Sequence, residues 1–318
     1  METMLGIHTR GSVKLTEIGR SLREPITLSK TQNRICRQLG KDNIKEVVGD
    51  NILEEGGSRI RRDSLLILDI SDITKKYAEK MEHLARVRDG SSGEITNGYW
   101  TMNVVGVELN KGKITPLHTH LYSQKSPEFV SENVEIINVV DRVIKHTGER
   151  GIWTIDRGGD RRRGVITPLM KRGQRFIIRM VGNRNLMYKG KEAKTIELAR
   201  SCRMLFAERI IREDKKREKS YHIELGFCRV KLPGFKKENL NLVVVNGFGK
   251  EPMMLLTNIG ITKSRKSLLS IVLSYIRRWQ MEETLRFCKQ SCNLEDILAG
   301  YSKRIRLPAR ADPQMSLF

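Results

Sequence analysis

The chain has 318 residues, enough for a large buried core and for two or three domains. Hydrophobic residues make up 39% of the chain and charged residues 30%, proportions that exclude a disordered or fibrous protein. Lys and Arg number 59 against 37 Asp and Glu, and the resulting net charge of +22 favours a polyanionic partner, above all nucleic acid.

The opening segment, METMLGIHTRGSV, lacks the apolar core of a signal peptide. No run in the sequence approaches the roughly eighteen apolar residues that a membrane span needs. We therefore expect a cytoplasmic protein without a membrane partner. The five cysteines contain no C-x2-C pair and are odd in number, which predicts reduced thiols rather than a disulfide framework or a zinc site.

Residues 1–63 predict a small helical N-terminal region. Three short helices are expected, over VKLTEIGRSLRE, TLSKTQNRICRQLG and DNIKEVVGDNILEE, because Pro25, Gly40 and Gly56 interrupt the pattern. Short basic helices with tight turns are typical of modules that recognise DNA ends, but they fit a helical lead-in packed on the next domain equally well. The region holds 12 Lys and Arg against 9 Asp and Glu, so its charge favours neither alternative.

Residues 64–170 predict the first part of a mixed α/β core. A strand-length apolar run, LLILD, ends at Asp69, and two further strands, YWTMNVVGVEL and KITPLHTHLY, complete a three-stranded meander. Ser126-Pro127-Glu128 predicts the start of a helix that runs to Gly148. One side of this helix is expected to carry Val130, Val134, Ile137 and Val140. A fourth strand, GIWTID, ends at Asp156.

Residues 171–255 predict a β-rich insertion, with strand-like segments RFIIRMV, SYHIELGFCRVKL and NLVVVNGFG. Basic charge gathers around it: residues 142–219 hold 23 Lys and Arg against 9 Asp and Glu. Such an excess predicts a surface that follows DNA phosphates. Residues 256–293 return to the core with a closing helix, and residues 294–318 form a C-terminal tail. The order of elements predicts one α/β core interrupted once.

The closing helix contains an unusual spacing of polar residues. In YIRRWQMEETLRFCK, Arg278, Glu282 and Lys289 follow Tyr275 by 3, 7 and 14 residues, so at about 100° per residue the four side chains share one helical face. A solvated face with ordinary salt bridges shows the same spacing. The pattern alone therefore leaves both interpretations open.

Three carboxylates favour a catalytic interpretation. Asp69 and Asp156 each end a strand, and Glu282 on the closing helix can converge with them. Three acids are the donor set that a pair of divalent ions needs in order to act on a phosphodiester. Asp at a strand end is also a common turn former, so each residue taken alone is a weak indication.

With these motifs the sequence resembles the DDE transposases of bacterial insertion sequences. The closing helix matches the branch whose last motif is Y-x2-R-x3-E-x6-K, LLILDISDITK resembles the first-Asp motif, and IDRGGDR resembles the second-Asp motif. The resemblance covers residues 60–292 in order. It implies a ribonuclease H-like catalytic fold with a β insertion between the second Asp and the Glu.

The resemblance also implies a reaction and its residues. Two Mg²⁺ ions, for which Mn²⁺ can substitute, would be held by Asp69, Asp156 and Glu282. Phosphates of the transposon end would be bound by Tyr275, Arg278 and Lys289. Water would attack the phosphodiester at the end of the element, and the freed 3′-hydroxyl would attack target DNA. Double-stranded DNA is thus the implied partner, bound by a homodimer.

Some alternatives stay open at this point. Asp72 and Asp160 lie close to the two chosen acids, which we prefer because each of them ends its apolar strand. A nuclease without strand transfer and a catalytically silent DNA-binding regulator are the competing functions. Relatives use a Trp of the insertion to hold a flipped base, and residues 171–255 contain none. Aromatic residues that can replace it are Tyr188, Tyr221, Phe227 and Phe248.

Two weaker patterns remain. His118 and His120 alternate in LHTHL and can share a metal ion, although a polar face of a hairpin explains them as well. The last five residues resemble the motif by which bacterial proteins dock on the replication sliding clamp, but a peptide this short more often arises by chance or packs on the protein's own surface. The residues of that motif are Gln314, Met315, Leu317 and Phe318.

Overall fold

The computed structural model describes residues 2–41, 44–90, 92–109, 112–214, 217–235 and 238–278. Several predicted site residues lie outside the described residues, namely Glu282, Lys289, Gln314, Met315, Leu317 and Phe318.

The described part of the chain begins with four helices and continues as a mixture of strands and helices. The helices are α1 (Glu2–Arg10), α2 (Leu15–Leu22), α3 (Leu28–Leu39), α4 (Ile44–Ser58), α5 (Glu132–Thr147), α6 (Thr167–Lys171), α7 (Thr195–Arg200) and α8 (Arg265–Ile276). The strands are β1 (Leu65–Thr74), β2 (Ala85–Arg88), β3 (Ile95–Val107), β4 (Ile114–Tyr122), β5 (Ile152–Ile155), β6 (Arg175–Arg179), β7 (Asn185–Tyr188), β8 (Lys191–Lys194), β9 (Met204–Asp214), β10 (Arg217–Val230), β11 (Leu240–Asn246) and β12 (Met253–Thr257).

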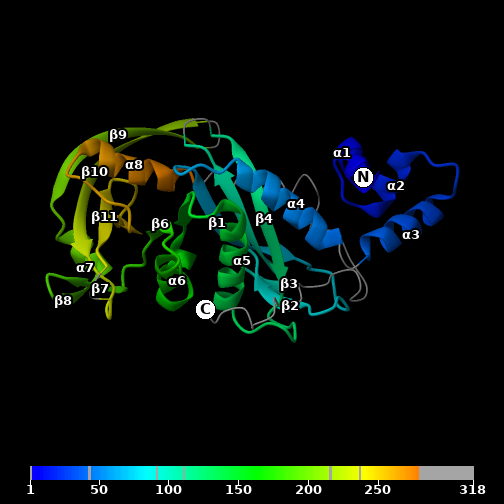
Figure 1. The fold of residues 1–318 in the computed structure, drawn as a ribbon, viewed down its shortest axis with the longest axis horizontal. Coiled ribbons are helices and arrows are strands. Elements are labelled where there is room, and N and C mark those ends of the chain that lie inside the picture. The colour runs from blue at the N-terminus through cyan, green and yellow to red at the C-terminus, as the bar shows by residue number, and fades with distance from the viewer. Residues whose placement is uncertain are drawn as a thin grey trace.

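Within the described part of the chain, all strands except the β7–β8 hairpin join one ten-stranded sheet (Figure 1). Its order is β2-β3-β1-β5-β6-β12-β11-β10-β9, and β4 also pairs with β3. β1, β5 and β6 run parallel to one another, whereas β3 runs antiparallel to both β1 and β4. The order β4-β3-β1-β5-β6 with β3 reversed is that of a ribonuclease H-like core. The predicted fold class is confirmed.

The strands of the predicted insertion extend this sheet rather than forming a separate one. β6, which begins four residues into the segment 171–255, pairs in parallel with β5 of the core. β12 then pairs antiparallel with β6, and β11, β10 and β9 follow in turn. Because hydrogen bonding is continuous across both segments, the boundary at residue 171 stays a prediction.

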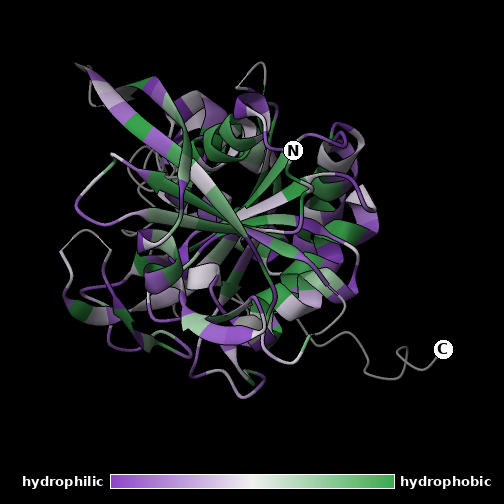
Figure 2. Ribbon diagram, turned by 90° about the vertical axis from the view of Figure 1, so that its left-hand side faces the viewer, coloured by the Kyte–Doolittle hydropathy of each residue, from purple (hydrophilic) through white to green (hydrophobic). Residues whose placement is uncertain are grey.

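Helices cover both faces of the sheet. One apolar cluster holds Leu66 and Leu68 of β1 together with buried residues of α4, α5, α6 and α7. The other holds Leu65 and Ile67 of the same strand together with α8. Successive strand residues point to opposite faces, so a continuous apolar run such as LLIL is what a strand buried on both sides requires. Figure 2 shows hydrophobic strands at the centre and hydrophilic residues around them.

The start of α5 differs from the prediction. The helix begins at Glu132, capped by the Ser131 side chain, which accepts a hydrogen bond from the backbone N–H of Val134. Ser126 instead accepts a backbone bond from Phe129 in a turn. The buried stripe is accordingly shifted to Ile136, Val139, Val140 and Val143, and Val130 is exposed.

The N-terminal helices agree with the prediction, with one addition and one difference. α2 and α3 fall within their predicted segments, whereas α4 begins in the third segment and continues through the predicted break at Gly56 to Ser58; α1 precedes them. Helices α1, α2 and α3 gather at one end of the molecule, and the β9–β10 hairpin curves over the other end (Figure 1). The short edge strand β2 was not predicted either.

Candidate active site and nucleic-acid interface

Asp69 and Asp156 lie side by side at one edge of the parallel strands. Leu68 of β1 and Ile155 of β5 are register partners, and the two acids are the residues that follow them. Asp69 continues the alternation of Leu65 and Ile67, so its side chain is on the face that α8 covers. Asp156 follows the end of β5, but β1 continues through Asp69 to Thr74, so the prediction that Asp69 ends its strand is wrong. The register nevertheless gives the two acids neighbouring positions, as convergence on a shared metal site requires.

Arg278 joins this edge from the end of α8. Its guanidinium Nη1 lies 3.3 Å from Oδ1 of Asp69, and both side chains are largely buried, with 5% and 14% of their surface exposed. The guanidinium carbon lies 5.7 Å from the centre of the Tyr275 ring. The end of the closing helix therefore contacts the first acid directly.

Tyr275 occupies a different environment from the one predicted. Its side chain is fully buried in the apolar cluster beneath α8. Among the described residues, its hydroxyl has no hydrogen-bond partner. In this structure the hydroxyl is too deeply buried to contact a DNA phosphate. The phosphate-binding role of Tyr275 stays a prediction.

Asp72 and Asp160, the alternative acids, are held by other parts of the chain. The Asp72 carboxylate is buried and accepts a hydrogen bond from the N–H of Gly90 at 3.2 Å. The Asp160 carboxylate is also buried, and it accepts hydrogen bonds at 2.8 Å from the N–H of Val181 and from Nε of Arg184. Carboxylates occupied in this way fit a structural role, because buried charges need such partners.

A chain of hydrogen bonds holds the loop that follows Asp156. Oδ1 of Asp156 accepts from the N–H of Gly158 at 2.8 Å, and the carbonyl of Gly158 accepts from Nε of Arg161 at 2.9 Å. The guanidinium of Arg161 also pairs with Glu132 of α5 at 2.7 Å, and Glu132 accepts from the Tyr122 hydroxyl at 3.1 Å. Strand β4, helix α5 and the Asp156 loop are therefore linked through Arg161.

Sequence reasoning missed this arrangement. Arg161 belongs to the motif IDRGGDR, but nothing in the motif indicates a partner on a helix 29 residues away.

Burial, followed by the nearby Glu132 carboxylate, raises the pKa of the Tyr122 phenol far above its ordinary value. The phenol is therefore neutral and donates its proton to Glu132.

His118 and His120 belong to a stack of rings rather than to a group of ligands. The rings of His118, His120, Tyr122 and Phe129 follow one another with centroids 6.3, 5.9 and 6.1 Å apart. Nε2 of His120 lies 2.7 Å from Oε2 of Glu135. The two histidines thus pack between β4 and α5.

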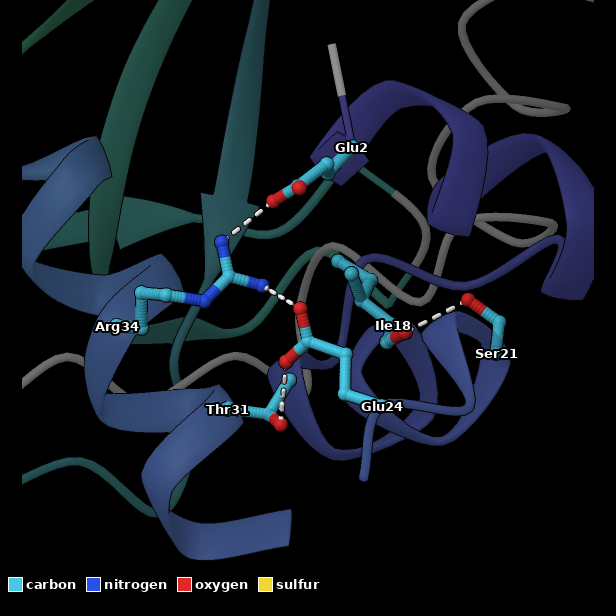
Figure 3. A network of polar contacts seen from close by, with 6 residues as sticks. All are labelled: Glu2, Ile18, Ser21, Glu24, Thr31 and Arg34. Atoms are coloured by element: carbon cyan, nitrogen blue, oxygen red, sulfur yellow. Dashed lines mark hydrogen bonds and ion pairs between the residues drawn. The ribbon is translucent and has the colours of Figure 1, made fainter. Parts of the chain in front are cut away.

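The N-terminal helices are tied together by Arg34 of α3 (Figure 3). Its guanidinium pairs with Glu2 of α1 and with Glu24, which lies in the turn between α2 and α3. Glu24 also accepts a hydrogen bond from Thr31 at 2.8 Å. This network fixes α3 against the two helices before it.

The outer side of α3 carries polar residues that suit contact with DNA. Its exposed residues include Ser29, Lys30, Asn33 and Arg37. Ser29, Asn33 and Arg37 are spaced four residues apart, so they share one helical face. Asn and Arg are side chains that read base edges, and Lys and Ser bind phosphates.

An open groove of about 740 Å³ lies between the sheet extension and the start of α8. It is lined by residues of β9, β10 and β11, among them Arg209, His222 and Asn246, and by Arg265. Arg265 forms an ion pair with Glu208 across it. Nearby, Tyr221 and Phe248 form a tilted ring pair with centroids 5.2 Å apart. Both are among the aromatic residues considered for base stacking.

The described part of residues 2–278 contains no group of three or more His, Cys, Asp or Glu residues placed to hold a metal ion. The third predicted acid, Glu282, lies beyond that range.

None of the described helices has both the length and the apolar character needed to span a bilayer.

Comparison with known proteins finds similarity in structure but not in sequence. No family model matches the sequence, and no curated protein matches it. Among solved structures, the chain is similar to a piggyBac transposase in a synaptic complex with hairpin DNA, with a TM-score of 0.49 and 11% sequence identity. The match covers 92% of this chain and 58% of the other, so the chain spans less than two thirds of that protein. This likeness is too low to assign a family.

Proposed function

We propose that the protein is a DDE transposase that cleaves DNA at the ends of its insertion sequence and joins them to target DNA. The observation that carries the proposal is the meeting of three motifs at one sheet edge. Asp69 and Asp156 follow paired residues of adjacent parallel strands, and Arg278 of the closing motif lies 3.3 Å from Asp69. These segments are far apart in the sequence, so a solvated helix face does not explain why they meet.

The donor set suits the implied metal. Asp69 and Asp156 supply carboxylate oxygens, the ligands that Mg²⁺ prefers, and Glu282 would complete the set for two ions. When bound, the ions would polarise the scissile phosphate and lower the pKa of an attacking water. Mn²⁺ would serve in the same place.

The protein's own groups would position the DNA. Arg278 is a planar fork suited to a phosphate, although here it is buried and paired with Asp69, so binding DNA would require it to change partner. Lys289 is a point charge that would bind a second phosphate. Water attacks the phosphodiester at the element's end, and the freed 3′-hydroxyl then attacks the target strand in line. Neither step requires a covalent intermediate with the protein.

Recognition of the DNA is assigned to other parts of the chain. The exposed face of α3 would enter a groove of the transposon end, which makes residues 1–63 an end-recognition region. The basic surface of the insertion would follow the phosphates. A homodimer would bridge the two ends, and the tail from Gln314 to Phe318 would dock on the sliding clamp.

The test uses the purified full chain and DNA carrying the flanking ends of its own genomic locus. With Mg²⁺, we expect cuts that leave 3′-hydroxyl ends at the element boundary, followed by joining to a target plasmid. Asp69→Ala, Asp156→Ala and Glu282→Ala should each lower cleavage by at least about 100-fold, because metal stabilisation of the transition state is worth several kcal/mol.

Each alternative gives a different result. Cleavage without joining indicates a nuclease that lacks strand transfer. Specific binding without any cut, unchanged in all three variants, indicates a silent regulator and refutes the catalytic assignment. Loss of binding by Asn33→Ala plus Arg37→Ala, with the fold intact by circular dichroism, tests the role of α3 separately.

A further inference from the structure

Two cysteines of the sheet extension lie near each other. Cys202 lies between α7 and β9, and Cys228 is in β10. Gly226 of β10 pairs with Met204 of β9 in antiparallel register, so extending that register by two residues sets Cys228 against Cys202. Directly opposed residues of antiparallel strands have Cα atoms about 4.5 to 5.5 Å apart, which is within the range that a disulfide spans.

Side-chain packing brings the two sulfur atoms to the same face of β10. A Cβ atom added at Gly226 would lie 2.9 Å from Sγ of Cys202, so this sulfur occupies the space over Gly226. Gly226 and Cys228 are two residues apart and face the same side of the strand. The Cys202 S–H donates to the carbonyl oxygen of Arg203 at 3.7 Å, and the side chains of Cys202 and Cys228 are both partly accessible.

The two thiols are not equivalent. The interaction between the two neighbouring thiols raises the pKa of Cys202 and lowers that of Cys228. The positive charge of Lys189, in the turn of the β7–β8 hairpin, further lowers the pKa of Cys228. Cys228 is thus the more nucleophilic position and Cys202 the resolving one.

We propose that Cys202 and Cys228 form a dithiol site that hydrogen peroxide oxidises to an intramolecular disulfide. The Cys228 thiolate attacks one peroxide oxygen, the O–O bond breaks, and Cys228 becomes a sulfenic acid as hydroxide leaves and takes up a proton. Sγ of Cys202 then attacks the sulfenic sulfur, its proton and the hydroxyl leave as water, and the S–S bond forms. Two thiols and one peroxide thus give one disulfide and two waters.

The experiment uses the full chain with Cys36→Ser, Cys288→Ser and Cys292→Ser, so that only the two candidate thiols remain. After brief treatment with hydrogen peroxide, the free-thiol count should fall from two to zero in one phase. Digestion without reductant should give one cross-linked peptide pair, which dithiothreitol separates. The monomer should persist on a non-reducing gel.

Single variants assign the roles. In Cys202→Ser, Cys228 should accumulate as a sulfenic acid that a cyclic 1,3-dione traps. In Cys228→Ser, Cys202 should react with peroxide at least about tenfold more slowly than Cys228 does in Cys202→Ser, because the thiolate fraction of Cys202 is smaller. Lys189→Gln should slow oxidation of the pair. Independent loss of the two thiols, disulfides only between molecules, or equal reactivity of both single variants would overturn the proposal. None of these readouts depends on DNA cleavage.

Discussion

Arg161 is the residue that connects the Asp156 loop to the rest of the core. It bonds to the carbonyl of Gly158 and to the carboxylate of Glu132 at the same time. The Asp156 carboxylate is in turn held by the N–H of Gly158. Arg161 is therefore a positioning residue for the second proposed metal ligand, and not itself a metal ligand.

If the proposed function holds, Arg161→Ala should lower Mg²⁺-dependent cleavage by about 10- to 100-fold, the usual effect of losing a group that orients a metal ligand. The Mn²⁺ concentration for half-maximal binding, followed by calorimetry, should rise by a similar factor. Arg161→Lys should restore part of the loss. Arg163→Ala removes the same charge from an exposed position and serves as the control. Equal effects of both alanine variants would indicate a charge effect only.

His118 makes stability depend on pH. Burial, followed by the charge of Arg142, lowers its pKa to about 4 from an ordinary value of 6.5. Between these values the unfolded chain binds the proton and the folded chain does not, so stability is fully present above about pH 6.5 and is lost as the pH falls toward 4. The contribution lost between about pH 7 and about pH 5 is about 2 kcal/mol.

Urea unfolding at the two pH values checks this expectation. His118→Gln has no titrating ring at this position, so its free energy of unfolding should fall by about 2 kcal/mol less than that of the unsubstituted protein over the same interval. An identical fall in both proteins would mean that His118 is already protonated in the folded state.

At the scale of the elements, α4 depends on two glycines for its close approach to the core. A Cβ atom on Gly56 would lie 2.7 Å from the carbonyl oxygen of Pro116 in β4, and one on Gly57 would lie 2.9 Å from that of His146 in α5. Both obstacles are backbone atoms, which cannot rotate away. The helix therefore crosses β4 and the end of α5 where it carries no side chain.

Gly57→Ala should lower the free energy of unfolding by about 1 to 3 kcal/mol, the usual cost of overpacking. Gly49→Ala is the matched control on the same helix, because its nearest neighbour is the flexible end of Arg142 at 3.7 Å. That substitution should stabilise the protein by up to about 1 kcal/mol through helix propensity. Denaturant unfolding of the two variants compares them directly, and equal effects would argue against the close contact.

At the scale of the whole molecule, the dominant feature is the strongly basic net charge of the chain. The net charge of +22 predicts that binding to DNA is dominated by phosphate contacts. If six or more phosphates are neutralised, affinity for DNA of any sequence should fall by about 10³-fold or more between roughly 50 and 200 mM salt. Fluorescence anisotropy over a salt series measures the slope, and a flat dependence would exclude the basic surface as the main binding face.

The fold class could be predicted because it depends on local pattern. An apolar run that stops at a carboxylate predicted a strand end at both Asp69 and Asp156, but only β5 ends there, because pairing with β3 carries β1 on to Thr74. The three-stranded meander of β1, β3 and β4 could be predicted from strand-length apolar runs in the same way. The start of α5 could not be predicted, because two capping sequences lie five residues apart and are locally equivalent. Stacking of Phe129 on Tyr122 accompanies the later start.

The sequence by itself thus determined the mixed α/β class and the basic character, since each depends on composition or on residues that are neighbours in the chain. Only the tertiary structure decided that Arg278 lies beside Asp69 and that Tyr275 is buried. It also paired Arg161 with Glu132 and joined the predicted insertion to the core sheet. These are contacts between distant segments, and their partners depend on how the sheet is ordered and which helix covers each face.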